Sequence, residues 1–178
     1  MSVMDKLIAA VTPPESSEAR AKAREEARQT AVSGDWLDQI FTHHEQIDDA
    51  FDKAEAATGA TDRTAALKEL GALLTGHSMA EEAVIYPQLS HDHKGPMGMS
   101  YQEQQAAKVQ VALLEALDPP SQDWVDKLGH LRGAVAHHVS EEEGSRFLKL
   151  HEELPAHVQA HMTQRYREET TRYGASLA

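Results

Sequence analysis

The clearest pattern along the chain is a set of apolar stripes that recur at alternating steps of three and four residues. Such steps place side chains on one face of a helix, so each stripe predicts a helix that packs against others. The stripes fall in the segments 35–59, 61–87, 100–117 and 121–154. No segment has the pattern of a strand. The sequence therefore predicts an all-α protein, an antiparallel four-helix bundle joined by short connections, with an additional helix at each end.

Capping residues indicate where these helices begin and end. Asp35 precedes the first stripe as a good N-cap, and Gly59 ends that helix. The second helix is expected to end near Pro87, because proline interrupts a helix. Residues 100–103, Ser-Tyr-Gln-Glu, fit a capping box and place the start of the third helix there. Segment 90–99, with glycine, proline and two histidines, is expected to be a loop.

Polar helical segments flank the predicted bundle, which spans residues 35–154. Residues 1–34 form an extension in which Thr12-Pro-Pro-Glu15 has the form of a helix start. Residues 155–178 contain an amphipathic helix, roughly 156–173, that is expected to pack on the bundle. The chain has 178 residues, which suits one domain with one core. Both terminal helices could also dock a protein partner or a second copy of the chain.

Two short repeats carry the candidate chemistry. His77 and His138 are each followed by a glutamate four residues later, Glu81 and Glu142, and by an aromatic residue nine residues later. A separation of four places the histidine and the glutamate one turn apart on the same helix face. In both helices that face is the apolar seam, and His44 also falls on the seam of its helix. Three histidines and two glutamates are therefore expected to project into one bundle interior.

The buried carboxylates indicate a metal site. Burying two carboxylates is very costly unless a positive charge lies between them. A divalent or trivalent cation supplies that charge, and imidazole with carboxylate donors suits iron or manganese. A single histidine on a seam would more often be a satisfied core residue, whereas two pairs and a third histidine in register favour a metal.

Four neighbours of these residues fall off the seams. His43 and His137 lie about 100° around the helix from their seam neighbours and are interpreted as outer or surface groups. Glu82 and Glu143 are interpreted as flanking charges.

In combination, the seam histidine and the two His-x-x-x-Glu pairs closely resemble the hemerythrin-like (HHE cation-binding) domain family. The resemblance covers about residues 35–153. It implies a four-helix bundle with a non-haem centre of two iron ions, bridged by the helix-borne glutamates. Members of the family bind oxygen, respond to nitric oxide or redox stress, or supply iron for cluster repair. The resemblance therefore implies oxygen, nitric oxide or peroxide as small ligands.

The chain departs from the family pattern on its third helix, where the family usually has a histidine ligand. That position falls at Gln104, with Glu103 beside it, and helix periodicity fits both residues about equally well. Glu103 is either a replacement carboxylate ligand or the glutamate of the capping box. The predicted metal ligands are His44, His77, Glu81, Glu103, His138 and Glu142.

Composition and charge exclude several functions. The net charge is −12 with scattered basic residues, which argues against nucleic-acid binding. The absence of cysteine excludes disulfides, zinc–thiolate sites, iron–sulfur clusters and thiol nucleophiles. Residues 1–18 do not resemble a signal peptide, and no stretch approaches the about 20 apolar residues of a membrane span. We therefore expect a cytoplasmic protein without a membrane partner.

Three functions remain open at this point. The leading hypothesis is a non-catalytic iron-binding protein that serves in oxygen, nitric oxide or oxidative-stress response. The first alternative is an enzyme, a di-iron or di-manganese oxidase or peroxidase, because open coordination positions permit oxygen or peroxide activation. The second alternative is a helical interaction module with a structural metal. The oligomeric state is left open.

Overall fold

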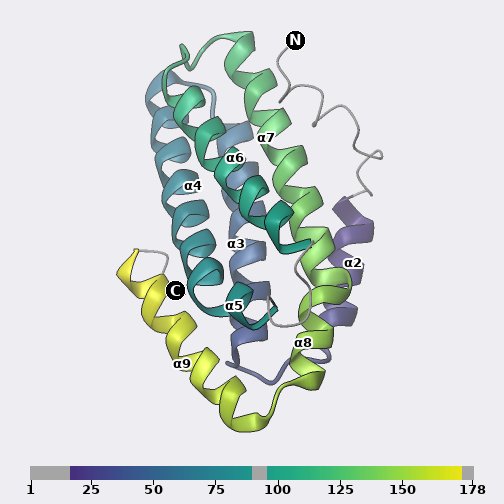
Figure 1. The fold of residues 1–178 in the computed structure, drawn as a ribbon. Helices are drawn as coiled ribbons and strands as arrows, with labels where there is room; N and C mark the ends of the chain where they lie inside the picture. The colour runs from purple at the N-terminus through teal and green to yellow at the C-terminus, as the bar shows by residue number, and fades with distance from the viewer. Residues whose placement is uncertain (1–16, 90–95, 174–178) are drawn as a thin grey trace.

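The computed structural model describes residues 17–89 and 96–173, and all regular structure in these ranges is helical. The bundle consists of the long helices α3 (Trp36–Ala56), α4 (Ala60–Ala80), α6 (Pro96–Glu115) and α7 (Gln122–Glu141). Consecutive long helices run in opposite directions, with α3 packed on α4 and α6 on α7 (Figure 1). The predictions of an all-α fold and of an antiparallel bundle of four long helices with an additional helix at each end are confirmed.

Two of the long helices continue through a π-helical turn into a short helix. Helix α4 leads through η1 (Glu81–Ile85) into α5 (Tyr86–Leu89), and α7 leads through η2 (Glu142–Arg146) into α8 (Phe147–Glu153). In such a turn the hydrogen bond spans five residues, which inserts one residue into the helical register. Each π turn begins at the glutamate of a His-x-x-x-Glu pair.

The terminal helices lie on opposite sides of the bundle (Figure 1). Helix α2 (Ser17–Arg28) contacts α3 and η2, whereas α9 (Ala156–Arg172) contacts α3, α4 and η1. The amide of Trp36 donates to the Thr163 hydroxyl at 3.0 Å and ties α9 to the start of α3. The predicted helix start at Thr12 lies outside the described residues, and the proposed division of the chain into three segments stays a prediction.

The end of the second helix differs from the sequence prediction, whereas the start of the first agrees with it. Asp35 caps α3, and its side chain accepts a hydrogen bond from the Asp38 amide at 2.8 Å. Pro87 does not end the second helical segment, which continues to Leu89. Pro87 directly follows the π turn η1, in which the Tyr86 amide bonds to the Glu81 carbonyl five residues back, so the regular i→i−4 ladder is already interrupted where the proline N–H is missing.

The third helix begins at Pro96, so the prediction of a capping box at Ser100 is wrong. Proline is favoured at the start of a helix, and it moves the start four residues upstream. Ser100 is buried inside the helix and accepts a hydrogen bond from Arg146 Nη1 at 2.8 Å. Of the predicted loop, residues 90–95 with His91 and His93 lie outside the described residues.

Two clusters of buried apolar side chains hold the bundle together. The first cluster includes Trp36 and Phe147, and the second includes Phe51 and Trp124. Along α3, His44 lies between residues of the first cluster and residues of the second, and along α4 His77 lies between Leu74 of the second cluster and Ala80 of the first. The buried polar residues therefore form a layer between two apolar clusters. Within the described ranges, no helix is long and apolar enough to cross a membrane.

Candidate metal centre

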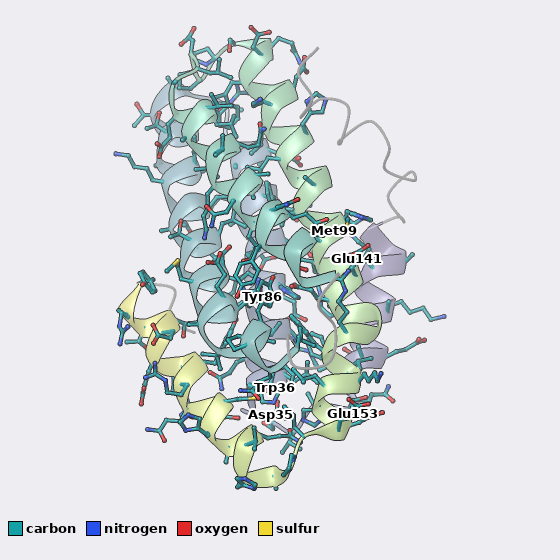
Figure 2. All side chains as sticks on the ribbon, viewed as in Figure 1. Asp35, Trp36, Tyr86, Met99, Glu141 and Glu153 are labelled. Atoms are coloured by element: carbon teal, nitrogen blue, oxygen red, sulfur yellow. The ribbon has the colours of Figure 1, made fainter. Side chains whose placement is uncertain are left out.

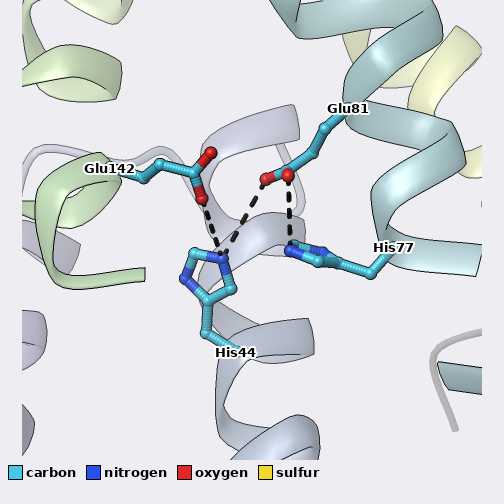
Figure 3. Close-up of side chains that lie close together, drawn as sticks. All are labelled: His44, His77, Glu81 and Glu142. Carbon is cyan, nitrogen blue, oxygen red and sulfur yellow. Dashed lines mark ion pairs between the residues drawn. The ribbon is translucent and has the colours of Figure 1, made fainter. Parts of the chain in front are cut away.

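The polar layer contains a compact group of two histidines and two glutamates. The group consists of His44 from α3, His77 from α4, Glu81 at the start of η1 and Glu142 at the start of η2. One nitrogen or oxygen atom of each residue lies within 4.8 Å of the others, and the four side chains converge on one point (Figure 3). Both glutamates are fully buried. One His-x-x-x-Glu pair, the glutamate of the other pair and the seam histidine thus meet as the apolar stripes predict.

The closest approaches in the group join imidazole Nε2 atoms to carboxylate oxygens. His77 Nε2 lies 3.4 Å from Glu81 Oε2, and His44 Nε2 lies 3.6 Å from Glu142 Oε2 and 4.0 Å from Glu81 Oε1. Within this group, four buried atoms make no hydrogen bond: the Nε2 atoms of the two histidines, Glu81 Oε1 and Glu142 Oε2. An unsatisfied buried polar atom costs about 1–3 kcal/mol, so such atoms are rare. Four of them directed at one point fit a bound cation.

Burial changes the charge that these groups can carry. The pKa of His77 lies well below its usual range because burial, and then the other histidines nearby, disfavour the imidazolium form. Neutral imidazole is the form that binds a metal. The pKa of Glu81 lies well above its usual range because of burial and then the negative charge of Glu142. A cation between the two carboxylates would remove this repulsion.

His138 approaches the same carboxylates from a second side. Its Nε2 lies 3.2 Å from Glu142 Oε1, whereas the other oxygen of Glu142 faces His44. Burial alone would lower the pKa of His138, but Glu142, Glu103 and Glu81 outweigh it and raise that pKa well above its usual range. Glu142 therefore has one oxygen towards each of two histidines, His138 and His44.

A tyrosine hydroxyl and an amide complete the interior beside His138. The Tyr86 hydroxyl donates to Glu142 Oε1 at 2.9 Å and accepts from Gln104 Nε2 at 2.7 Å. Gln104 Nε2 also donates to Glu81 Oε2 at 2.6 Å. Tyr86 is buried in the middle of the bundle (Figure 2), and burial, with the two carboxylates, raises its pKa. The sequence pattern shows an aromatic residue at this spacing but does not indicate that its hydroxyl enters the site.

The third helix presents Gln104, and not Glu103, to the interior. Gln104 and Ser100 are both buried and lie four residues apart, so they share the inward face of α6. The Glu103 side chain is 29% exposed, and its Oε2 contacts His138 Nδ1 at 2.9 Å. This contact is also the main reason that the pKa of Glu103 is lowered. Five of the six predicted ligands thus converge, whereas Glu103 lies behind His138.

Glu143, interpreted from the sequence as a flanking charge, is a buried part of the site. It is 4% exposed, and its Oε1 lies 2.8 Å from His44 Nδ1 and 2.6 Å from Arg24 Nε. The interpretation is wrong because helix α2 packs against η2 and its Arg24 covers and pairs with Glu143. Glu82 holds the same place in the π turn η1 but is only partly buried, so the π turn alone does not bury the second glutamate.

The other three off-seam neighbours differ in their burial. His43 is fully buried, with its Nδ1 3.0 Å from the Tyr166 hydroxyl of α9. Glu82 is only partly buried and forms an ion pair with Lys108 at 2.9 Å. His137, whose side chain is 41% exposed, lies 3.6 Å from Glu141. Of the four, only His43 and Glu143 belong to the surroundings of the centre.

A second group with donor atoms close together lies nearer the surface. It consists of Glu103, His137 and Glu141, all partly buried. Glu141 accepts from Arg146 Nη2 at 2.6 Å, and Glu103 contacts His138. Both carboxylates therefore have a positively charged or donating partner, whereas in the buried group one oxygen of each glutamate, Glu81 Oε1 and Glu142 Oε2, accepts no hydrogen bond.

Comparisons with known proteins agree with this geometry. Residues 36–150 match the profile of the hemerythrin HHE cation binding domain. A curated protein named DNA nickase, from Nostoc sp. (strain PCC 7120 / SAG 25.82 / UTEX 2576), is 32% identical over 82 residues, 46% of this chain and 23% of the nickase. The chain thus spans less than a quarter of that relative. No solved structure matches the chain significantly.

Proposed function

The chain belongs to the hemerythrin HHE cation-binding domain family, and on this premise we propose that it is a non-haem iron protein. The observation that carries the proposal is the set of four unpartnered buried atoms on His44, His77, Glu81 and Glu142. Imidazole and carboxylate donors in a bundle core suit iron, with manganese as the alternative metal. Iron would supply reversible binding and redox chemistry towards oxygen, nitric oxide or peroxide.

Two ions that share the glutamates are part of this proposal. The first position lies at the group of four, and the second lies beside His138 Nε2, with Glu142 Oε1 and Glu81 Oε2 next to it. The second position has fewer histidine donors, and hydrogen bonds from Tyr86 and Gln104 already occupy its carboxylate oxygens. We therefore expect the second ion to bind more weakly than the first.

The surroundings support small ligands. Apolar clusters on both sides keep bulk water from the layer, and a small molecule held there would lie beside the polar Tyr86 hydroxyl and Gln104 amide. We propose that the protein binds oxygen or nitric oxide in a response to oxidative stress, inside the cytoplasm.

Anaerobic loading with iron(II), followed by metal analysis, tests the proposal. We expect two ions per chain at excess iron, and less than one in His77→Ala. His130→Ala is the matched control, because His130 lies on α7 but is exposed at a distant cavity beside Leu117. Wild-type protein that retains no iron, or a His77→Ala variant that retains as much as wild type, would contradict the proposal. Absorption changes on adding oxygen or nitric oxide would test the ligand.

One observation favours a second candidate, a di-iron or di-manganese oxidase or peroxidase. The Tyr86 hydroxyl is a proton donor in direct contact with Glu142, and proton donation to a reacting oxygen is a usual part of such reactions. Peroxide consumption by the metal-loaded protein separates the candidates. Turnover that falls in Tyr86→Phe while metal content is kept would favour the enzyme, whereas a stable adduct without turnover would favour the binding protein.

Cleavage of DNA is not part of the proposal. The nickase relative is mostly unmatched by this chain, and a net charge of −12 disfavours contact with a phosphate backbone. We propose small ligands and no nucleic acid, which a binding measurement with duplex DNA at low salt would check. A protein partner or a homo-oligomer formed through the terminal helices stays a prediction.

A further inference from the structure

Each of the three candidate metal-binding histidines has a partner behind its ring. The Nε2 atoms face the two carboxylates, and the Nδ1 atoms face outward. The outward contacts are His44 to Glu143 at 2.8 Å, His77 to the Tyr166 hydroxyl at 3.2 Å, and His138 to Glu103 at 2.9 Å. A histidine that binds a metal through one ring nitrogen usually donates its other N–H to such a partner, which fixes the tautomer and the orientation of the ring.

Two of these contacts depend on helices outside the matched domain, which spans residues 36–150. Tyr166 belongs to α9 and is fully buried. Arg24 belongs to α2 and is 6% exposed; its guanidinium contacts Glu143 Oε1 at 2.6 Å and Asp48 Oδ2 at 3.0 Å. The terminal helices therefore reach the centre from opposite sides, one through Tyr166 and the other through Arg24 and Glu143.

We propose that Arg24 and Tyr166 are positioning residues through which helices α2 and α9 set the affinity of the centre for its metal. The proposal rests on the proposed function and adds to it that the functional unit is larger than the matched domain. Neither residue contacts the metal position itself. Each acts by holding an imidazole ring with its Nε2 directed at the carboxylates.

One arrangement of protons satisfies the contacts around Tyr166. If His77 binds a metal through Nε2, its proton is on Nδ1 and is donated to the Tyr166 oxygen. The Tyr166 hydroxyl can then donate to His43 Nδ1, 3.0 Å away. Without the hydroxyl, His77 Nδ1–H would be left buried and unpaired, so the ring would turn or take the other tautomer.

Arg24 acts on His44 through Glu143. The Glu143 carboxylate accepts from His44 Nδ1 and from Arg24 Nε with the same oxygen, Oε1. An ionised carboxylate in this buried position needs a cationic partner to stay there. Removal of the guanidinium would leave Glu143 free to move away from His44, which would then lose its acceptor.

Substitutions can remove these contacts while the packing of both helices is kept. The Tyr166 ring belongs to the apolar cluster around Trp36, so Tyr166→Phe keeps the ring and removes only the hydroxyl. Helix α2 also pairs with α3 through Arg28, which contacts Asp38 and Glu45 and no residue of the centre. Arg28 therefore offers a matched control on the same helix.

Competition with a chelator under anaerobic conditions would measure the iron(II) affinity of full-length variants. We expect Tyr166→Phe and Arg24→Gln each to weaken binding by about 10- to 100-fold, the usual effect of losing such a partner. Tyr173→Phe, at the exposed end of α9, and Arg28→Gln should bind as tightly as wild type. Arg24→Lys, which keeps a cation near Glu143, should recover part of the affinity.

Cobalt(II) loading supplies a readout that a merely structural role would not change. The visible spectrum of bound cobalt(II) depends on the geometry of its ligands, so we expect it to differ from wild type in Tyr166→Phe and Arg24→Gln but not in the controls. Wild-type affinity and spectrum in both variants would overturn this proposal alone, as would equal losses in the controls. A wild-type protein that binds no metal would overturn the proposed function and this proposal with it.

Discussion

The two halves of the centre, α4–η1–α5 and α7–η2–α8, have the same sequence motif and the same backbone conformation but different neighbouring residues. In both, a histidine precedes a glutamate by four residues, and a π turn begins at that glutamate. The next residue differs in its environment. Glu82 lies near the surface with Lys108, whereas Glu143 is buried between His44 and Arg24.

The aromatic residues that follow the two π turns differ as well. The Tyr86 hydroxyl reaches the carboxylates, whereas Phe147 is fully buried in the apolar cluster with Trp36. The shared motif thus supplies candidate metal donors in both halves. The positions that differ supply the other groups of the site. One half supplies a hydroxyl inside the site, and the other supplies the carboxylate that holds the histidine of α3.

Removal of the buried charge of Glu143, in the half α7–η2–α8, should lower the free energy of unfolding by the largest amount. Glu143→Gln leaves Arg24 buried without its closest anion, so the free energy of unfolding should fall by about 3 kcal/mol. Glu82→Gln, its counterpart in the first half, should cost less than about 1 kcal/mol because its ion pair is partly exposed. Urea unfolding of the metal-free proteins measures both. Similar losses in the two variants would mean that the halves are equivalent at this position.

Exchange of the aromatic residue of either half for that of the other should lower the free energy of unfolding by a smaller amount. Tyr86→Phe removes the donor to Glu142 and the acceptor for Gln104, which should cost about 2 kcal/mol. Phe147→Tyr places a hydroxyl in an apolar cluster, at a cost of about 1–3 kcal/mol. Calorimetry of the metal-free variants would check these values. A Phe147→Tyr variant as stable as wild type would show that the second half tolerates the hydroxyl of the first.

The smallest change in the free energy of unfolding is expected for substitution of Glu103. This residue of α6 lies behind His138, the histidine of the half α7–η2–α8. Glu103→Gln keeps an acceptor for His138 Nδ1 and removes a partly exposed charge. The free energy of unfolding should change by less than about 1 kcal/mol, and the iron content of the loaded protein should not change. Metal analysis checks this expectation: loss of one bound ion would contradict it and show that the ion beside His138 needs the Glu103 charge, as a ligand or through His138.

The helices and the inward-facing histidines of the centre could be predicted from the sequence, because both depend on the local repeat of apolar residues at steps of three and four. The steps of three and four residues align His44, His77 and His138 with apolar neighbours, and burial of those neighbours carries the histidines inside. Asp35 and Ser121 mark helix starts because each side chain accepts from an amide of the first turn.

The burial of Glu143, the start of α6 and the contact between Arg24 and Glu143 could not be predicted from the 3.6-residue repeat of a helix. Helix α2 covers Glu143, so the sequence pattern, which describes only the face of its own helix, wrongly places Glu143 outside. Pro96 starts α6 earlier than the capping box at Ser100 indicates, and burial of Ser100 then selects Gln104 for the interior. The contact between Arg24 and Glu143 joins residues 119 positions apart, and no local pattern records it.

The polar layer lies between two apolar clusters that are each complete without it. In small zinc domains the energy of metal binding is also the energy of folding, so the empty protein is an unfolded chain. Here the two apolar clusters lie outside the layer and include the largest buried side chains, and the partners behind the histidine rings belong to helices that pack in the same bundle. We therefore expect the bundle to stay folded when an ion leaves the centre and another enters it.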